Sequence, residues 1–338
     1  MRFVAATAIC VLAALSPARA ADPVDSFYAG KTVTLLIGYS AGGGYDTYAR
    51  VLARHMGDHI PGKPTVVPQN MTGAGSLRAV NYLYGVAAKD GTVMATFARG
   101  MAMEPLLNPT GTQFDAQKLT WIGSVSNEVS ICGFMAEAGI KNWQDMREKS
   151  YTLGGSGPGA DTDIFPVALK NMFGLKLKLA TGYPGGADIT LAMQRHEIDG
   201  RCGWSWSSIL SRNHDMLDAK AFTIPLQFAL EKHEDLPNVP LVLELTQDPK
   251  KLAALKLIVS RQAMARPFAA PPGIPADRRD ALRAAFDATM KDKDFLAEAQ
   301  KNDLEVRPIS GVALEKLIGE LYQSPPDVVE LAKQIIKE

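Results

Sequence analysis

The glycine-rich segment near the start of the chain carries residues for two different chemistries. Residues 38–42, GYSAG, fit G-x-S-x-G, the turn that exposes the nucleophilic serine of many hydrolases. Gly42, Gly43 and Gly44 follow and lead into a helical pattern, which suits a site where backbone N–H groups bind an anion. Ser40 is therefore either a nucleophile or part of an anion-binding turn.

The serine hydrolase interpretation lacks a base in the expected place. A serine triad needs a histidine beside the serine, and in α/β-hydrolases that histidine comes late in the chain. Here no histidine follows residue 233, and the motif follows the first strand of the mature chain. The segment is also neither a P-loop nor G-x-G-x-x-G, and no H-E-x-x-H is present. We expect no enzyme, no cofactor and no metal site, with an exported serine hydrolase as the alternative.

Glycine-rich turns recur along the sequence. They lie at residues 40–46, 71–76, 154–161 and 183–188, each between an apolar run and a helical pattern. Glycine lets successive N–H groups point at one spot, and a following helix adds its positive end. In open α/β sheets such turns lie at the carboxyl ends of the strands, where ligands bind. We expect these turns to bind a carboxylate from two sides without an arginine cluster.

The elements that position these turns are alternating strands and helices. Strands are predicted over 31–39, 63–70 and 91–100, with helices following the glycines. A second series of strands and helices begins near residue 128, and a late helix from Pro275 has a buried face of five residues. This pattern predicts an α/β protein with mainly parallel sheets in two lobes. The five residues are Leu282, Ala285, Phe286, Thr289 and Met290.

Residues 1–20 have the features of a secretory signal peptide. Arg2 precedes an apolar stretch, and Ala18 and Ala20 occupy the small-residue positions of a cleavage site before Ala21. We therefore expect a periplasmic protein cleaved after Ala20. Cys132 and Cys202 then remain. They either form a disulfide in the oxidising compartment or stay as two buried free thiols, and we favour the free thiols. The net charge of +0 does not suggest a nucleic-acid partner.

The ordered series of motifs resembles the Bug family, the substrate-binding receptors of tripartite tricarboxylate transporters. The segments on which this resemblance rests are GGGYDTYAR, VVPQNMTGAGS, DGTVMATFARG, FDAQKLTWIGSV, TGYPGGADITLAMQRHEIDG and PFAAPPGIPADRRDALRAAF. The resemblance implies a periplasmic-binding-protein fold of type II with a cleft between two lobes. It also implies lobes of residues 21–125 with 262–338 and of residues 126–261, with hinge strands near 122–130 and 255–265.

The resemblance implies ligand-binding residues in both lobes. Three of them have an open alternative: Asp46 either caps its helix or contacts the ligand, Arg99 pairs a carboxylate or lies in water, and Trp204 stacks on the ligand or packs in the core. Serine and alanine replace the prolines usual before the glycines, so the Ser40 hydroxyl can donate. The expected set is Tyr39, Ser40, Gly42, Gly43, Gly44, Asp46, Arg99, Gly100, Ser156, Gly157, Gly159, Asp161, Tyr183, Gly185 and Trp204.

The function that the resemblance implies is solute capture. The expected ligand is a small organic acid: a dicarboxylate, a tricarboxylate or an aromatic carboxylate. The closed protein would deliver it to the subunits of an inner-membrane transporter. A ligand sensor without a role in transport is a second alternative.

Overall fold

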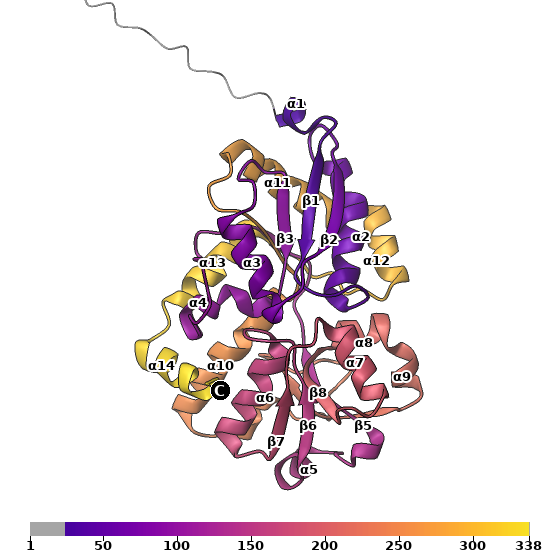
Figure 1. The fold of residues 1–338 in the computed structure, drawn as a ribbon, viewed down its shortest axis with the longest axis vertical. Helices are drawn as coiled ribbons and strands as arrows, with labels where there is room; N and C mark the ends of the chain where they lie inside the picture. The colour runs from indigo at the N-terminus through magenta and orange to yellow at the C-terminus, as the bar shows by residue number, and fades with distance from the viewer. Residues whose placement is uncertain (1–23, 338) are drawn as a thin grey trace, which may run out of the picture.

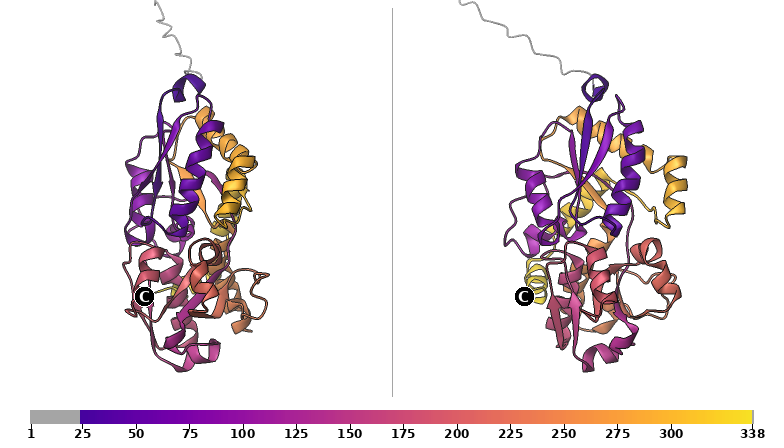
Figure 2. Two further views of the ribbon diagram at one scale, coloured as in Figure 1. Left: turned by 90° about the vertical axis from the view of Figure 1, so that its right-hand side faces the viewer. Right: turned by 45° about the vertical axis from the view of Figure 1, so that its right-hand side comes forward.

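The computed structural model describes residues 24–337, which form two bodies, each built around a β-sheet (Figure 1). The predicted signal peptide lies outside the described residues. Two further views show the two bodies stacked end to end along the long axis (Figure 2). The predicted two-lobed α/β fold is confirmed. Within residues 24–337, no helix is long and apolar enough to cross a bilayer.

The first sheet has six strands in the order β11-β4-β10-β3-β1-β2. Strand β1 runs parallel to β2 and β3, whereas β10 runs antiparallel to β3 and β4, and β11 antiparallel to β4. The strands are β1 Thr32–Ile37, β2 Thr65–Asn70, β3 Val93–Thr96, β4 Thr120–Ser124, β10 Pro267–Ala270 and β11 Ile309–Ser310.

Both faces of this sheet are covered by helices. Val33 and Leu35 of β1 pack in one apolar cluster with α2 and α11, while Leu36 packs in another with α3 and α13. This alternation follows from the period of two in a strand and explains why Leu35, Leu36 and Ile37 are apolar and buried in succession. The helices are α1 Val24–Tyr28, α2 Gly44–His59, α3 Leu77–Gly85, α4 Glu104–Leu107, α11 Ala276–Thr289, α12 Lys293–Lys301 and α13 Gly311–Tyr322.

The second sheet has five strands in the order β7-β6-β8-β5-β9. Strand β6 runs parallel to β7 and β8, and β5 runs antiparallel to β8 and β9. The strands are β5 Ser130–Met135, β6 Tyr151–Gly154, β7 Leu177–Ala180, β8 Gly200–Ser205 and β9 Phe222–Phe228. The helices are α5 Trp143–Glu148, α6 Asp161–Phe173, α7 Gly186–Gln194, α8 Trp206–Arg212, α9 His214–Asp218 and α10 Pro249–Val259.

The sheets are mixed, and this corrects the expectation of mainly parallel sheets. The antiparallel pairs involve the strands beside the two crossings between the lobes, β4 leading to β5 and β10 entering the first sheet. A chain that leaves one sheet and later returns to it can enter in the opposite direction. The parallel βα units lie away from these crossings.

The expected hinge strand near 255–265 is wrong, because this segment is helical. Residues 249–259 form α10, and a 3-10 helix follows over Ser260–Met264 before β10 begins. The Asp248 carboxylate accepts hydrogen bonds from the N–H groups of Lys250 and Lys251, and Pro249 occupies the first turn. This N-terminal cap favours a helix where an apolar run alone is ambiguous.

The C-terminal helix α14, Pro326–Ile335, contacts the second lobe. Val329 and Ala332 join the apolar cluster of the second sheet, which also contains Leu255 of α10. Figure 1 shows α14 beside α10 and far from the outer end of the first lobe. The division into residues 21–125 with 262–338 and residues 126–261 remains a proposal, in which α14 is the segment that crosses back.

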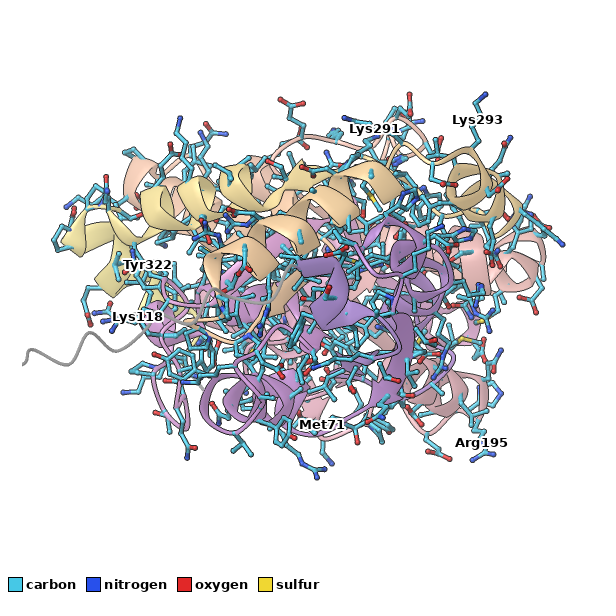
Figure 3. All side chains as sticks on the ribbon, turned by 90° about the horizontal axis from the view of Figure 1, so that it is seen from above. Met71, Lys118, Arg195, Lys291, Lys293 and Tyr322 are labelled. Carbon is cyan, nitrogen blue, oxygen red and sulfur yellow. A yellow bond between two sulfur atoms is a disulfide. The ribbon has the colours of Figure 1, made fainter. Side chains whose placement is uncertain are left out.

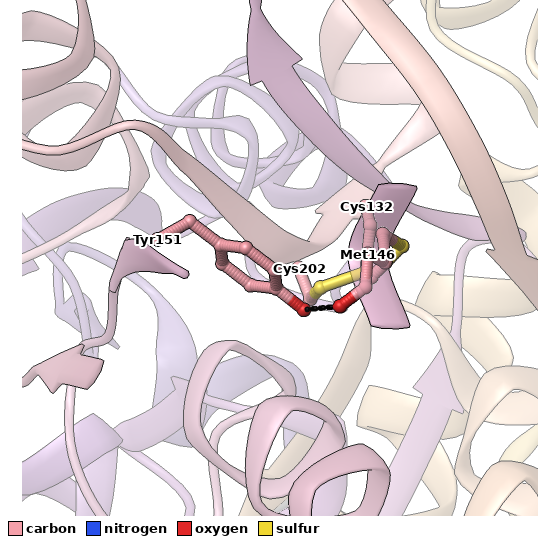
Figure 4. The surroundings of a disulfide bond; sticks show 4 residues. All are labelled: Cys132, Met146, Tyr151 and Cys202. Carbon is pink, nitrogen blue, oxygen red and sulfur yellow. Dashed lines mark hydrogen bonds between the residues drawn. A yellow bond between two sulfur atoms is a disulfide. The ribbon is translucent and has the colours of Figure 1, made fainter. Parts of the chain in front are cut away.

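Cys132 and Cys202 form a disulfide, so the preference for free thiols is wrong (Figure 4). The two cysteines lie on adjacent antiparallel strands, where Ile131 pairs with Trp204 and Gly133 with Arg201. The strand pairing therefore places the two thiols opposite each other, although they are 70 residues apart in sequence. Sequence spacing alone contains no information about this register.

Candidate functional site

A cavity of about 380 Å³ lies between the two sheets. Its walls come from the β1–α2 turn and the residues after β3 on one side, and from the ends of β6, α6, α7, β8 and α8 on the other. Eight residues of the expected set line it: Tyr39, Gly42, Gly43, Gly44, Arg99, Ser156, Asp161 and Trp204. The cavity has the size of a pocket for a small molecule.

Asp46 organises the first glycine turn and does not line the cavity. Its carboxylate accepts hydrogen bonds from the Gly42 N–H at 2.9 Å, from Arg50 Nε at 2.9 Å and from Asn70 Nδ2 at 2.9 Å. Gly42 has a φ of +83°, which favours glycine. The carboxylate thus holds the turn in the shape that directs α2 at the cavity, and the hydrogen bond from the Gly42 N–H fits the alternative in which Asp46 caps its helix.

The N-terminal ends of two helices meet at the cavity. Helix α2 begins at Gly44 and helix α7 at Gly186. A Cβ built on Gly43 would lie 3.8 Å from the amide nitrogens of both Gly186 and Ala187. Helix α6 begins at Asp161, which also lines the cavity. Free N–H groups and positive helix ends from both lobes therefore face one space, as binding of an anion requires.

Ser40 connects the lobes and has no histidine beside it. Its hydroxyl donates to Asp188 Oδ2 at 2.5 Å, and its N–H donates to Pro184 O at 3.2 Å. The five histidines each lie against a carboxylate elsewhere in the protein. Ser40 does not line the cavity, and a Cβ on Gly185 would lie 2.3 Å from its hydroxyl oxygen.

The glycine turn at residues 71–76 does not line the cavity and packs against the turn at residues 154–161, of which only Ser156 and Asp161 line it. The Gly75 N–H of the first lobe donates to Ser156 O of the second at 2.9 Å. A Cβ on Gly75 would lie 2.6 Å from Pro158 O, and one on Gly157 would lie 2.7 Å from Gly75 N. This contact corrects the expectation that all four turns face the ligand. The backbones of the two turns are in direct contact, and only glycine, which has no Cβ, allows so close an approach.

Two further glycines of the expected set also serve close packing between the lobes. A Cβ on Gly100 would lie 2.1 Å from Gly159 O, and one on Gly159 would lie 2.7 Å from the Glu104 carboxylate. Neither residue lines the cavity. Tyr183 likewise lies outside it, packed with the apolar cluster of the second lobe.

The cavity wall contains an arginine cluster, of which the sequence analysis predicted only Arg99, and this corrects the expectation of a site without such a cluster. Arg99 is 3% exposed and forms an ion pair with Asp161 at 3.1 Å. Arg266 is 1% exposed and forms an ion pair with Glu128 at 3.2 Å. Its guanidinium carbon also lies 4.7 Å from the centre of the Tyr45 ring. Arg201 and Arg212 complete the set. Arg201, Arg212 and Arg266 lie outside the motif segments of the sequence analysis, so no local pattern predicted them.

Strand β8 turns two side chains into the cavity by means of a bulge. Gly203 has a φ of +68°, and the pairing of β8 with β5 shifts in register at this point. Arg201 and Trp204 therefore both line the cavity, and the guanidinium lies 5.3 Å from the indole ring. Trp204 is 1% exposed and packs against Phe222, so the core alternative describes most of its surface.

Ser156 lines the cavity at the start of the turn before α6. Its N–H donates to Asp163 Oδ2 at 2.7 Å, and the N–H of Gly157 donates to the same oxygen at 2.8 Å. Burial raises the pKa of the Asp163 carboxyl, in spite of these hydrogen bonds. Asp163 thus organises the second-lobe turn in the way that Asp46 organises the first.

The fold is that of known solute-binding proteins. The periplasmic binding protein BugD superposes with a TM-score of 0.72 at 20% identity, over 91% of this chain and 98% of that one. MatC from Rhodopseudomonas palustris with bound malate gives 0.69 at 17% identity, over 89% and 99%. A TctC solute-binding protein from Polaromonas gives 0.57 at 15% identity, over 91% and 99%.

Sequence comparison adds one curated relative. A UPF0065 protein in the TAR-I ttuE-ttuC' intergenic region of Agrobacterium vitis is 25% identical over 272 residues, which cover 78% of this chain and 73% of that protein. No family model matches the chain. These findings bear out the resemblance that the motifs indicate. The chain has the two-lobed fold of the periplasmic binding proteins, and its structural neighbours are solute-binding proteins of the Bug and TctC type.

Proposed function

We propose that this protein is a periplasmic receptor that binds a small carboxylic acid between its two lobes. The observation that carries the proposal is the charge of the cavity wall, where four arginines and one aspartate surround the facing ends of α2 and α7. Positive helix ends and guanidinium groups that face one cavity favour a negatively charged ligand. Malate in the similar MatC supports this ligand class.

Delivery to an inner-membrane transporter is the further part of the proposal. It rests on the resemblance to receptors of tripartite tricarboxylate transporters. Export rests on the signal peptide expected over residues 1–20 and is supported by the disulfide between Cys132 and Cys202, because such bonds persist in oxidising compartments. Binding would stabilise the closed arrangement of the lobes, which the carrier would recognise.

A thermal-shift screen tests the ligand class. The panel contains malate, adipate, citrate and benzoate, with the neutral amides of the same acids as controls. A bound acid should stabilise the protein by mass action, by about 2.7 kcal/mol at 100 times its dissociation constant. Stabilisation by the acids and not by the amides is the expected result, whereas no response to any acid would contradict the proposal.

Gly43→Asp tests the location of the site. Gly43 has a φ of −84°, and its Cβ would have room, so the backbone tolerates the change. The new carboxylate would lie near the free N–H groups of α7, where it competes with the ligand. We expect carboxylate binding to be lost in calorimetry while the thermal unfolding profile survives.

The matched control for Gly43→Asp is Gly319→Asp. Gly319 lies in α13 with open space around its Cβ position, so this change adds the same charge away from the cavity. Unchanged binding by the control is expected. Normal binding by Gly43→Asp would show that the glycine turn is not part of the site.

A further inference from the structure

Arg201 differs from the other buried arginines of the protein. Four arginines in the described residues are buried: Arg99, Arg201, Arg261 and Arg266. Arg99 and Arg261 lie near the Asp161 carboxylate, at 3.1 and 3.7 Å, and Arg266 contacts Glu128. Within residues 24–337, Arg201 has no carboxylate partner, although it is only 6% exposed.

The hydrogen bonds of Arg201 leave its charge uncompensated. Nη1 donates to Gly186 O at 2.7 Å and lies 3.4 Å from Thr190 Oγ1, both neutral acceptors. Nε is buried and has no hydrogen-bond partner among the described residues. The face of Trp204 offers partial compensation at 5.3 Å. Burial lowers the pKa of the guanidinium to about 10, which reflects the cost of keeping it charged there.

The position of the guanidinium adds to this cost. A Cβ on Gly186 would lie 3.1 and 3.2 Å from the two terminal nitrogens, so the group sits against the first residue of α7. The N-terminal end of a helix carries a partial positive charge and disfavours a cation. Two positive features therefore face the same cavity, and an anion between them would relieve both.

We propose that Arg201 binds the ligand carboxylate directly and is the residue that selects a charged acid over its neutral amide. The carboxylate would lie between the guanidinium and the N–H groups of Gly186 and Ala187, opposite Gly43 of the first lobe. A planar guanidinium suits a carboxylate because two parallel hydrogen bonds can form. This inference rests on the proposed function and adds to it a specific charged contact in the second lobe.

The test compares Arg201→Met and Arg201→Lys with Arg195→Met. Figure 3 shows Arg195 on the outside of the molecule, and it is exposed, so it is the matched control in the same lobe. Calorimetric titration uses malate, adipate, citrate, benzoate and their amides. We expect Arg201→Met to bind the acids at least about tenfold more weakly than wild type and to lose the preference for acid over amide. The affinity of Arg201→Lys for the acids should lie between those of wild type and Arg201→Met.

A second measurement separates ligand contact from a structural role. Methionine fills similar space without a charge, so the ligand-free Arg201→Met protein should unfold at the same temperature as wild type or higher. A structural arginine would instead show a lower unfolding temperature in the variant. That result, or unchanged affinity in Arg201→Met, would overturn the inference, whereas a wild-type protein that binds none of the acids would overturn the proposed function itself.

Discussion

At the scale of single residues, Asp46 shows how a side chain shapes a site that it does not enter. Burial by itself would raise the pKa of its carboxyl, but hydrogen bonds from Arg50, Gly42 and Asn70 outweigh that effect and hold the pKa below the ordinary value of 3.8. An ionised Asp46 therefore stabilises the turn between β1 and α2. Glycine provides the conformations of this turn, and the carboxylate selects one of them.

Asp46→Asn should lower the stability of the protein by about 1–2 kcal/mol at neutral pH, because it weakens several hydrogen bonds to a charged group. Because the folded pKa is depressed, the contribution of Asp46 is complete above the ordinary pKa of 3.8 and is lost as the pH falls through the folded pKa. The difference in unfolding temperature between wild type and variant should be constant from about pH 5 to 8 and narrow below about pH 4.

Thermal unfolding, monitored by circular dichroism at a series of pH values, measures how the stabilising effect of Asp46 depends on pH. The control is Asp58→Asn, a change of the same kind at an exposed position of α2. We expect little effect of the control at any pH. A difference between wild type and Asp46→Asn that persists unchanged into strong acid would contradict the role given to the ionised carboxylate.

At the scale of elements, the disulfide joins the centre of the second sheet. Cys132 on β5 and Cys202 on β8 belong to one apolar cluster, with the hydrogen bond from the Tyr151 hydroxyl to Met146 O nearby (Figure 4). Because of the bulge at Gly203, Arg201 and Trp204 both lie on the opposite face of β8, where the cavity lies. One strand thus contributes Cys202 to the apolar core on one face and Arg201 to the cavity wall on the other.

Replacing both cysteines by alanine should lower the free energy of unfolding by about 4 kcal/mol, the value that loop-closure entropy predicts for residues 70 apart. Urea unfolding with and without a reductant measures the effect. The urea midpoint of the double variant should be the same with and without the reductant, which shows that the reductant acts only through the disulfide. Equal urea midpoints of the oxidised wild type and the double variant would show that the bond does not constrain the unfolded chain.

At the scale of the whole molecule, the lobes are in contact along the edges of the cavity. Ser40 with Asp188, and Gly75 with Ser156, are direct contacts between the lobes. Arg99 extends from the first lobe to the Asp161 carboxylate of the second. The cost of separating the lobes therefore includes these hydrogen bonds and this ion pair.

Gly75→Ala should hinder closure of the two lobes. The added Cβ would lie 2.6 Å from Pro158 O across the interface, so the lobes would have to shift apart. Gly75 also has a φ of +59°, which strains any other residue. Gly174→Ala is the matched control, because Gly174 has a φ of +69° with nothing near its Cβ position.

Calorimetry with the acid that gives the largest thermal shift measures the effect on binding. We expect at least about tenfold weaker affinity in Gly75→Ala, and unchanged affinity with a small loss of stability in Gly174→Ala. Small-angle scattering should show a smaller ligand-induced decrease of the radius of gyration in Gly75→Ala. Equal affinities in the two variants would mean that closure does not require this contact.

The sequence by itself determined the local helices and strands and the glycine turn at residues 42–44 that forms one wall of the cavity. Apolar runs with β-branched residues predict β1, β2 and β3, and the periodicity after Pro275 predicts the buried face of α11, which the structure confirms in all five residues. The glycine turn at residues 42–44 is predicted because its chemistry is local: residues without a Cβ between a strand and a helix. The turns at 154–161 and 183–188 are also found, although only part of each lines the cavity.

Only the tertiary structure decided which of these turns line the cavity and which charged side chains surround it. Arg201 and Arg266 come from different strands and loops, and neither stands in a motif, so their convergence depends on the register of β8 and on the return of the chain through α10. The pairing of Cys132 with Cys202 depends on the same register. Local interactions select a helix, strand or turn, whereas contacts between distant segments depend on how complete sheets and helices pack, which no short stretch of sequence encodes.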